Sequence, residues 1–188
     1  MRLILASGSP RRRELLASAG VDFDVVPADV DERLQPGERP DDYVSRVAAA
    51  KAAAIPLDEH TVILAADTAV VVDEMILGKP SDEACAMGML ALLSGRWHQV
   101  LTAVVVRWSE GGGDRIGCRV VKTDVEMCEL SDQAIAEYVA TGEPMDKAGA
   151  YGIQGAAQAF VTDVRGSRSN VAGLPIAETL DLLRSTPP

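Results

Sequence analysis

Residues 3–26 read LILASGSPRRRELLASAGVDFDVV, and this stretch predicts the β-α-β opening of an α/β fold. The apolar run Leu3–Ala6 is typical of a short buried strand. A helix is expected to begin at Ser9-Pro10, a good N-cap followed by a good first helical residue, and to end at Gly20. Val21–Val26 then returns to the apolar, β-branched character of a strand.

The remainder of the chain continues this alternation and adds a hairpin. Further helices are expected at Asp41–Ala54, from Ser81 to Ser94, from Ser131 to Ala140 and from near Pro175 to Arg184. Strands are expected at Thr61–Ala66, Ala69–Val72, Gln99–Trp108, Arg119–Met127 and Gln158–Val164, with a hairpin loop at Glu110–Gly113. Strands that alternate with helices but include a hairpin favour an α/β or α+β class with a mixed central sheet flanked by helices.

Length and charge limit the possible classes of function. With 188 residues, 47% of them hydrophobic, the chain is long enough for one sizeable core, so a single domain over residues 1–188 is expected. The 28 acidic residues outnumber the 18 basic ones and give a formal net charge of -10. This charge disfavours nucleic acid polymers and anionic membranes as partners. A phosphate-bearing ligand would therefore need a local basic pocket.

The cysteine content and the lengths of the apolar runs indicate the cellular compartment of the protein. Cys85, Cys118 and Cys128 are odd in number and form no C-x-x-C pair, so neither a disulfide framework nor a zinc site is indicated. The first apolar run is too short for a signal peptide, and no run approaches the roughly 18 residues of a membrane span. These features predict a soluble, cytoplasmic protein.

The first candidate site is the segment Ser7-Gly8-Ser9-Pro10-Arg11-Arg12-Arg13. The free amides of the first helical turn and the positive end of the helix dipole favour an anion there, and phosphate would bond both the amides and the guanidinium groups. The alternative is a solvated basic turn. Because its charge opposes the helix dipole, removing Arg12 is expected to leave stability unchanged or slightly higher.

The second candidate is Asp67, which lies in the apolar run Ile63–Val71. A carboxylate in such a run is costly to bury unless it is hydrogen-bonded, paired or bound to a metal. Function is one justification for it. An Asx turn at Asp67-Thr68 that ends the first strand and separates it from the next is the other.

Weaker signals lie elsewhere in the chain. The pair Asp31-Glu32 follows the second strand, where open α/β sheets place ligands, although acidic loop residues are more often simply solvated. Lys51 and Lys79 are further cationic candidates, whereas Gly149–Gly155 matches neither a Walker sequence nor a dinucleotide fingerprint. His60 and His98 lack metal-ligand spacing and are expected to be structural. Arginines, lysines and carboxylates form the set expected for metal-assisted attack on a phosphoanhydride.

These motifs occur in an order that resembles the Maf family over about nine tenths of the chain. The resemblance rests on Leu5-Ala6-Ser7-Gly8-Ser9-Pro10-Arg11-Arg12, Asp31-Glu32, Lys51-Ala52, Ala66-Asp67-Thr68, Gly78-Lys79-Pro80, Ser94-Gly95 with His98, Val100 and Thr102, Lys147-Ala148-Gly149-Ala150-Tyr151-Gly152-Ile153-Gln154-Gly155, Gly166-Ser167 and Val171-Ala172-Gly173-Leu174-Pro175. It implies an α/β, ITPase-like fold with two lobes around a nucleotide-binding cleft. It also implies a divalent metal, Mg or Mn, a homodimer, and hydrolysis of a nucleoside triphosphate to the monophosphate and pyrophosphate.

The resemblance also assigns roles to particular residues. Asp67 matches the family's proposed proton acceptor and, with Glu32, the residues that hold metal. The residues that match positions holding phosphate or metal are Ser9, Arg12, Glu32, Lys51 and Lys79. One departure is Ala50, because many relatives carry a glutamate immediately before the lysine.

The family divides by substrate, and Arg11, Thr68 and Gln154 resemble the branch that acts on dTTP and UTP. The branch that acts on 7-methylated GTP usually carries tryptophan, glutamine and glutamate at these positions. Three other functions remain open at this point. The chain could be a 7-methyl-GTP pyrophosphatase, a nucleotide-binding regulator of septum formation, or a general phosphatase that releases inorganic phosphate.

Overall fold

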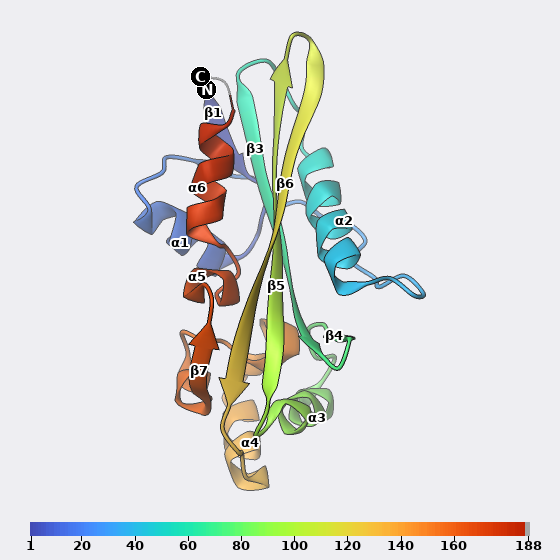
Figure 1. The fold of residues 1–188 in the computed structure, drawn as a ribbon, viewed down its shortest axis with the longest axis vertical. Helices are drawn as coiled ribbons and strands as arrows, with labels where there is room; N and C mark the ends of the chain where they lie inside the picture. The colour runs from blue at the N-terminus through green and yellow to red at the C-terminus, as the bar shows by residue number, and fades with distance from the viewer. Residues whose placement is uncertain (187–188) are drawn as a thin grey trace. The chain divides into compact units, whose positions relative to one another are not determined.

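The structure, a computed structural model, describes residues 1–186 and contains a mixed sheet (Figure 1). The strands are β1 (Arg2–Leu5), β2 (Asp24–Val25), β3 (Thr61–Val72), β4 (Met75–Leu77), β5 (Trp97–Glu110), β6 (Gly113–Met127) and β7 (Val161–Arg165). They pair in the order β2-β1-β3-β5-β6-β7, and β4 pairs with β3. β1 is parallel to β2 and β3, whereas β4 and β7 are antiparallel to their partners. The predicted α/β fold with a mixed sheet is confirmed.

Helices connect these strands. The α-helices are α1 (Pro10–Ser18), α2 (Pro40–Ala53), α3 (Glu83–Leu93), α4 (Asp132–Val139), α5 (Arg168–Val171) and α6 (Ile176–Arg184). Three short 3-10 helices are η1 (Glu143–Asp146), η2 (Ala148–Ala150) and η3 (Ala156–Phe160). No helix within residues 1–186 is both long enough and apolar enough to cross a membrane.

The chain divides into two compact units. Unit 1 contains Met1–Asp67, Thr102–Val121 and the segment that begins at Gly173, whereas unit 2 contains Thr68–Leu101 and Lys122–Ala172. Strands β3, β5 and β6 contribute residues to both units. The expectation that residues 1–188 form a single domain stays a prediction.

The core of unit 1 lies between its strands and two helices. Leu16 of α1 and Leu182 of α6 are buried in one apolar cluster with Val62, Leu64 and Val104 of β3 and β5. Helix α2 lies on the other side of these strands in Figure 1. Side chains alternate along a strand, so Arg107 points away from this cluster, and its Nη1 donates to the carbonyls of Ala52 and Ile55, 3.3 and 3.1 Å away, at the end of α2. Two helix layers therefore enclose the strands of unit 1.

The core of unit 2 is formed by α3 and α4 against the other halves of the strands. Leu90 and Leu93 of α3 and Tyr138 of α4 are buried in a cluster with Val70 of β3 and Met127 of β6. Helix α4 has a well-developed apolar face, and its N-cap Ser131 accepts a hydrogen bond from the Ala134 amide at 3.2 Å, as expected for Ser131.

Several boundaries differ from the sequence-based expectation for identifiable reasons. The strand expected at Val21–Val26 is only β2, two residues at a sheet edge that pair with Ile4 and Leu5. Helix α3 is capped by Asp82 and not by Ser81, because the Asp82 carboxylate accepts from the Cys85 amide at 2.7 Å and a carboxylate is the stronger acceptor. The strand expected from Gln158 begins at Val161, after η3.

The two hairpins show why one was predictable and the other was missed. Gly111 and Gly112 join β5 to β6 with φ of 61° and 78°, a left-handed conformation that glycine adopts without strain, so the predicted loop is confirmed. Asp73 and Glu74 join β3 to β4 with φ of 49° and 63°. Aspartate is common at the first position of such a turn, but Glu74 stands where glycine is usual, and β4 therefore gave no sequence signal.

His98 is buried in unit 2, as expected for a structural histidine. Its Nε2 lies 2.6 Å from the Tyr151 hydroxyl, and the two rings meet edge to face with centroids 5.3 Å apart. Its Nδ1 is buried and has no hydrogen-bond partner among the described residues. Burial lowers the pKa of His98 to about 4.

We expect this histidine to make the protein less stable in mild acid. The unfolded chain binds a proton at His98 near its ordinary pKa of about 6.5, whereas the folded chain does not until about pH 4, so stability is lost as the pH falls through this interval. The loss is on the order of 2–4 kcal/mol if the whole interval is crossed. Urea unfolding at about pH 7 and about pH 5 measures it.

His98→Gln is the matched variant, because glutamine keeps a polar group but does not titrate. Its stability should change less than that of the wild type between the two pH values. Equal changes in the two proteins would show that His98 has the same pKa in the folded and unfolded chain, and would contradict the lowering of its pKa by burial.

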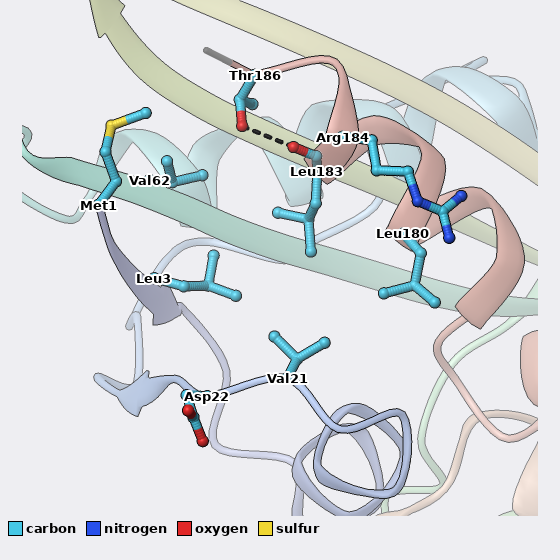
Figure 2. A pocket seen from close by; sticks show the side chains of 9 residues that line it. All are labelled: Met1, Leu3, Val21, Asp22, Val62, Leu180, Leu183, Arg184 and Thr186. Atoms are coloured by element: carbon cyan, nitrogen blue, oxygen red, sulfur yellow. Dashed lines mark hydrogen bonds between the residues drawn. The ribbon is translucent and has the colours of Figure 1, made fainter. Parts of the chain in front are cut away.

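Unit 1 also holds an open apolar pocket of about 370 Å³, shown in Figure 2. Leu3, Val21 and Leu183 point toward one another across it. The other lining residues are Met1, Asp22, Val62, Leu180, Arg184 and Thr186. None of the predicted site residues lines this pocket.

Candidate active site

The first part of the candidate site is the start of α1. The Ser9 side chain caps the helix by accepting from the Arg12 amide at 3.5 Å, Pro10 is the first helical residue, and the first turn contains no acidic residue. The hydroxyl of Ser7 accepts from the Ser9 amide at 3.2 Å and so fixes the turn that enters the helix. The predicted N-cap is confirmed, and Arg11 lies half-buried beside the buried Arg12.

Arg12 is buried, which contradicts the alternative interpretation of this segment as a solvated basic turn. Only 9% of the residue is exposed, its Nε donates to the Gly173 carbonyl at 2.8 Å, and its Nη1 donates to the Ser7 hydroxyl at 3.4 Å. Burial lowers the pKa of its guanidinium, and the carboxylates of Asp67 and Glu32 oppose this shift. These contacts reverse the expected effect of removing Arg12 on stability, because a buried carbonyl would lose a donor.

The second part is a lysine held between two carboxylates. Lys51 Nζ lies 2.8 Å from Asp67 Oδ1 and 2.7 Å from Glu32 Oε1. The side chains of Lys51 and Asp67 are 9% and 7% exposed, whereas that of Glu32 is 44% exposed. A buried charge is tolerated when it is paired, and this pairing lets β3 continue through Asp67 and Thr68. The expected break in the strand is wrong, and so is the Asx turn.

The surroundings of Asp67 favour its protonated form more than water would. Burial raises the pKa of its carboxyl, whereas the charges of Lys51 and Arg12 lower it and that of Glu32 raises it. The net direction is upward. A carboxylate with a raised pKa is a stronger base than an exposed aspartate, which suits a proton acceptor.

Two residues that the sequence did not single out hold the loop that carries Glu32. The Tyr43 hydroxyl donates to the Glu32 carbonyl at 3.0 Å, and Arg46 Nη2 donates to the Arg33 carbonyl at 3.0 Å. Arg46 also pairs with Glu38 at 2.6 Å. Burial, followed by the charges of Asp67 and Glu32, raises the pKa of Tyr43 to about 12. The spacing of Tyr43 and Arg46 on α2 was the available signal, because residues three apart share a helix face.

Three predicted site residues belong to unit 2. Thr68 is half-buried and follows Asp67 directly in β3, whereas Lys79 and Gln154 are both exposed. The Gly149 amide donates to the Gly78 carbonyl at 3.0 Å and so joins the segment before Lys79 to the loop that leads to Gln154.

Two glycines keep that loop in place. Gly149 has φ of 66°, and a side-chain carbon there would lie 2.8 Å from Val70. At Gly155, a side-chain carbon would lie 1.9 Å from Glu143 Oε1, and Glu143 Oε2 accepts from the Ala156 amide at 3.0 Å. The loop around Gln154 is therefore fixed by close packing against β3 and η1.

The carboxylates of Glu32 and Asp67 suit a divalent cation whose other ligands come from a substrate. Among residues 1–186 no group of three or more His, Cys, Asp or Glu side chains is placed to bind a metal. Magnesium, however, is typically bound through one or two carboxylates together with substrate phosphates. Glu32 and Asp67 already share one cation, the Lys51 ammonium, so their oxygens converge as such a pair requires.

The fold and this arrangement define an α/β protein with a cationic helix start and a paired carboxylate cluster in one unit. The family model described as Maf-like protein matches residues 2–186, and the chain belongs to the Maf family.

Individual relatives agree with this membership. The chain is 57% identical over 183 residues to a protein of Anaeromyxobacter dehalogenans named dTTP/UTP pyrophosphatase, covering 97% of this chain and 93% of that protein. A protein of the same name from Pseudoalteromonas atlantica is 50% identical over 186 residues, covering 96% and 95%. A solved nucleoside-triphosphatase, described as a dITP/XTP pyrophosphatase of Mycobacterium abscessus, aligns with a TM-score of 0.42 and 14% identity over 69% of this chain and 76% of that one.

Proposed function

We propose that this protein hydrolyses dTTP and UTP between the α and β phosphates and releases the nucleoside monophosphate and pyrophosphate. The observation that carries the proposal is the buried Asp67. Its carboxylate is ion-paired to Lys51, and the positive charge of Arg12 also acts on it. Membership of the Maf family and the names of relatives that are 49–57% identical support the substrate.

The proposed roles follow from the chemistry of each side chain. Asp67 accepts a proton from the water that attacks the α phosphorus, since its carboxyl is buried and its pKa is raised. Arg12, Lys51 and Lys79 neutralise the departing pyrophosphate. The N-terminus of α1, capped by Ser9, offers amides to a phosphate oxygen.

The other parts of the proposal rest on the family resemblance. Arg11, Thr68 and Gln154 select the pyrimidine base, as their resemblance to the dTTP/UTP branch implies; the names of the relatives support the substrate class. The protein acts as a homodimer in the cytoplasm. Size-exclusion chromatography with light scattering tests the dimer.

A divalent cation, Mg²⁺ or Mn²⁺, is part of the proposal, with Glu32 and Asp67 as its protein ligands. When bound, it would offset the negative charge of the triphosphate. We expect excess chelator to abolish turnover, because a tetra-anionic triphosphate that approaches two carboxylates would otherwise meet like charge. Turnover is measured with and without EDTA. Full activity in EDTA would contradict the metal requirement.

Ala50 offers a second test of the metal site. Ala50→Glu introduces the carboxylate that the family resemblance implies immediately before Lys51, so the metal concentration for half-saturation should fall, by roughly tenfold if the new carboxylate helps to hold the metal. Ala49→Glu is the matched control, since it adds the same charge to a half-buried alanine one position earlier on α2. Equal metal dependence in both variants would show that position 50 has no specific effect on metal binding.

The substrate itself is tested with a panel of nucleotides and chromatography of the products. We expect dTTP and UTP to give monophosphate and pyrophosphate faster than GTP, ATP or 7-methyl-GTP. Inorganic phosphate as the first product would indicate a phosphatase. Binding of nucleotide without turnover would favour the regulatory alternative.

A further inference from the structure

The ammonium of Lys51 lies between the carboxylates of Glu32 and Asp67, at the place where the proposed metal ion would bind. This ammonium bridges Glu32 and Asp67 at 2.7 and 2.8 Å. The Arg12 guanidinium also acts on both carboxylates through its charge. The formal charges of Arg12, Lys51, Glu32 and Asp67 cancel. These four residues, the charge cluster, are therefore balanced without any ligand.

The members of the charge cluster differ in how firmly they are held. Asp67 is fixed within strand β3, and the backbone of Glu32 is fixed by the Tyr43 hydroxyl at 3.0 Å. Arg12 is buried and donates to the Gly173 carbonyl at 2.8 Å. Lys51 is attached to α2 through a flexible four-carbon stem, and its ammonium is held by ion pairs to the two carboxylates.

We infer that Lys51 is an exchangeable counter-ion, which holds the carboxylate pair in the free protein and moves to a substrate phosphate when nucleotide and metal bind together. This inference rests on the proposed function, because it specifies the form in which that site takes its substrate. The substrate is the metal–nucleotide complex.

The positive charge of Lys51 explains why metal and nucleotide should bind together. A divalent cation that arrives alone must displace Lys51 from two short ion pairs and leave the ammonium without a partner in a largely buried position, which is costly. A nucleotide phosphate gives the ammonium a new partner and leaves the carboxylates for the metal. Metal alone should therefore bind weakly, and metal with nucleotide should bind much more tightly.

The test titrates Mn²⁺ alone into the protein and measures binding by electron paramagnetic resonance at mildly alkaline pH. Lys51→Met removes the internal cation, so Mn²⁺ should bind roughly tenfold more tightly or better than in the wild type. Lys51→Gln serves the same purpose and keeps a donor for one carboxylate if the methionine variant does not fold. Lys122→Met is the matched control, because it removes one exposed lysine of unit 2 and should bind Mn²⁺ like the wild type.

A second measurement uses the wild type and needs no variant. The relaxation rate of water protons reports Mn²⁺ that tumbles slowly on the protein. A strong enhancement is expected only when a non-hydrolysable α,β-imido analogue of dTTP is also present. Tight binding of Mn²⁺ to the wild type alone, or unchanged affinity in both Lys51 variants, would overturn the inference.

These outcomes are separate from those for the proposed function. Mn²⁺ binding without nucleotide does not depend on turnover, so the counter-ion inference can fail in a protein that still hydrolyses dTTP. Conversely, a protein that does not hydrolyse dTTP can still show tighter Mn²⁺ binding in the Lys51 variants.

Discussion

Asp67→Asn is expected to lower kcat by roughly a hundredfold or more, with nucleotide binding largely retained. Asparagine keeps the shape of the side chain within β3 but cannot accept a proton from water. The structure strengthens this expectation, because the carboxyl is buried, is paired with Lys51 at 2.8 Å, and has a raised pKa. Steady-state kinetics with dTTP and calorimetric binding of a non-hydrolysable analogue measure the two effects separately.

Asp163→Asn is the matched control for this substitution. Asp163 is an exposed aspartate of β7 that pairs with Arg165 at 3.6 Å, and removing its charge should leave kcat unchanged. If Asp67→Asn retained wild-type kcat, Asp67 would be a structural partner of Lys51, and another group would have to accept the proton.

Arg12→Ala is expected to lower kcat/KM for dTTP by roughly a hundredfold, because a substrate phosphate would lose a buried cationic partner. It should also destabilise the protein by about 1–3 kcal/mol, because the buried Gly173 carbonyl loses the donor that lies 2.8 Å away. Kinetics below the melting temperature of the variant, together with thermal unfolding, distinguish these losses.

Two variants sharpen the test at α1. Arg12→Lys keeps the charge but not the planar fork, so it should remain impaired. Arg13→Ala removes an exposed arginine of the same turn and should affect neither stability nor kcat/KM strongly. A lower melting temperature with unchanged kinetics in Arg12→Ala would show that Arg12 is structural.

Much of the fold follows from local sequence signals. Ser9-Pro10 and Ser131 begin helices as predicted, and the glycines at 111 and 112 form the expected hairpin. The errors arise where tertiary contacts override those signals. β3 continues through Asp67 because Lys51, sixteen residues earlier in the chain, neutralises the carboxylate. No local pattern predicts such a pairing.

The candidate site was predictable in its residue types more than in its contacts. The sequence and the family motifs selected Arg12, Glu32, Lys51 and Asp67, and the structure places all four in unit 1. The bridging position of Lys51 and the burial of Arg12 depend on side chains that meet only after folding. Tyr43 was missed because its role is to hold a backbone carbonyl, which the spacing of Tyr43 and Arg46 on α2 does not reveal by itself.

The position of bond cleavage is the central claim, and hydrolysis of dTTP in oxygen-18 water tests it most directly. Attack of water on the α phosphorus places the label in the nucleoside monophosphate, and mass spectrometry of the separated products detects it. We predict label in dTMP and none in pyrophosphate. Label in pyrophosphate would mean attack at the β phosphorus and would contradict the account.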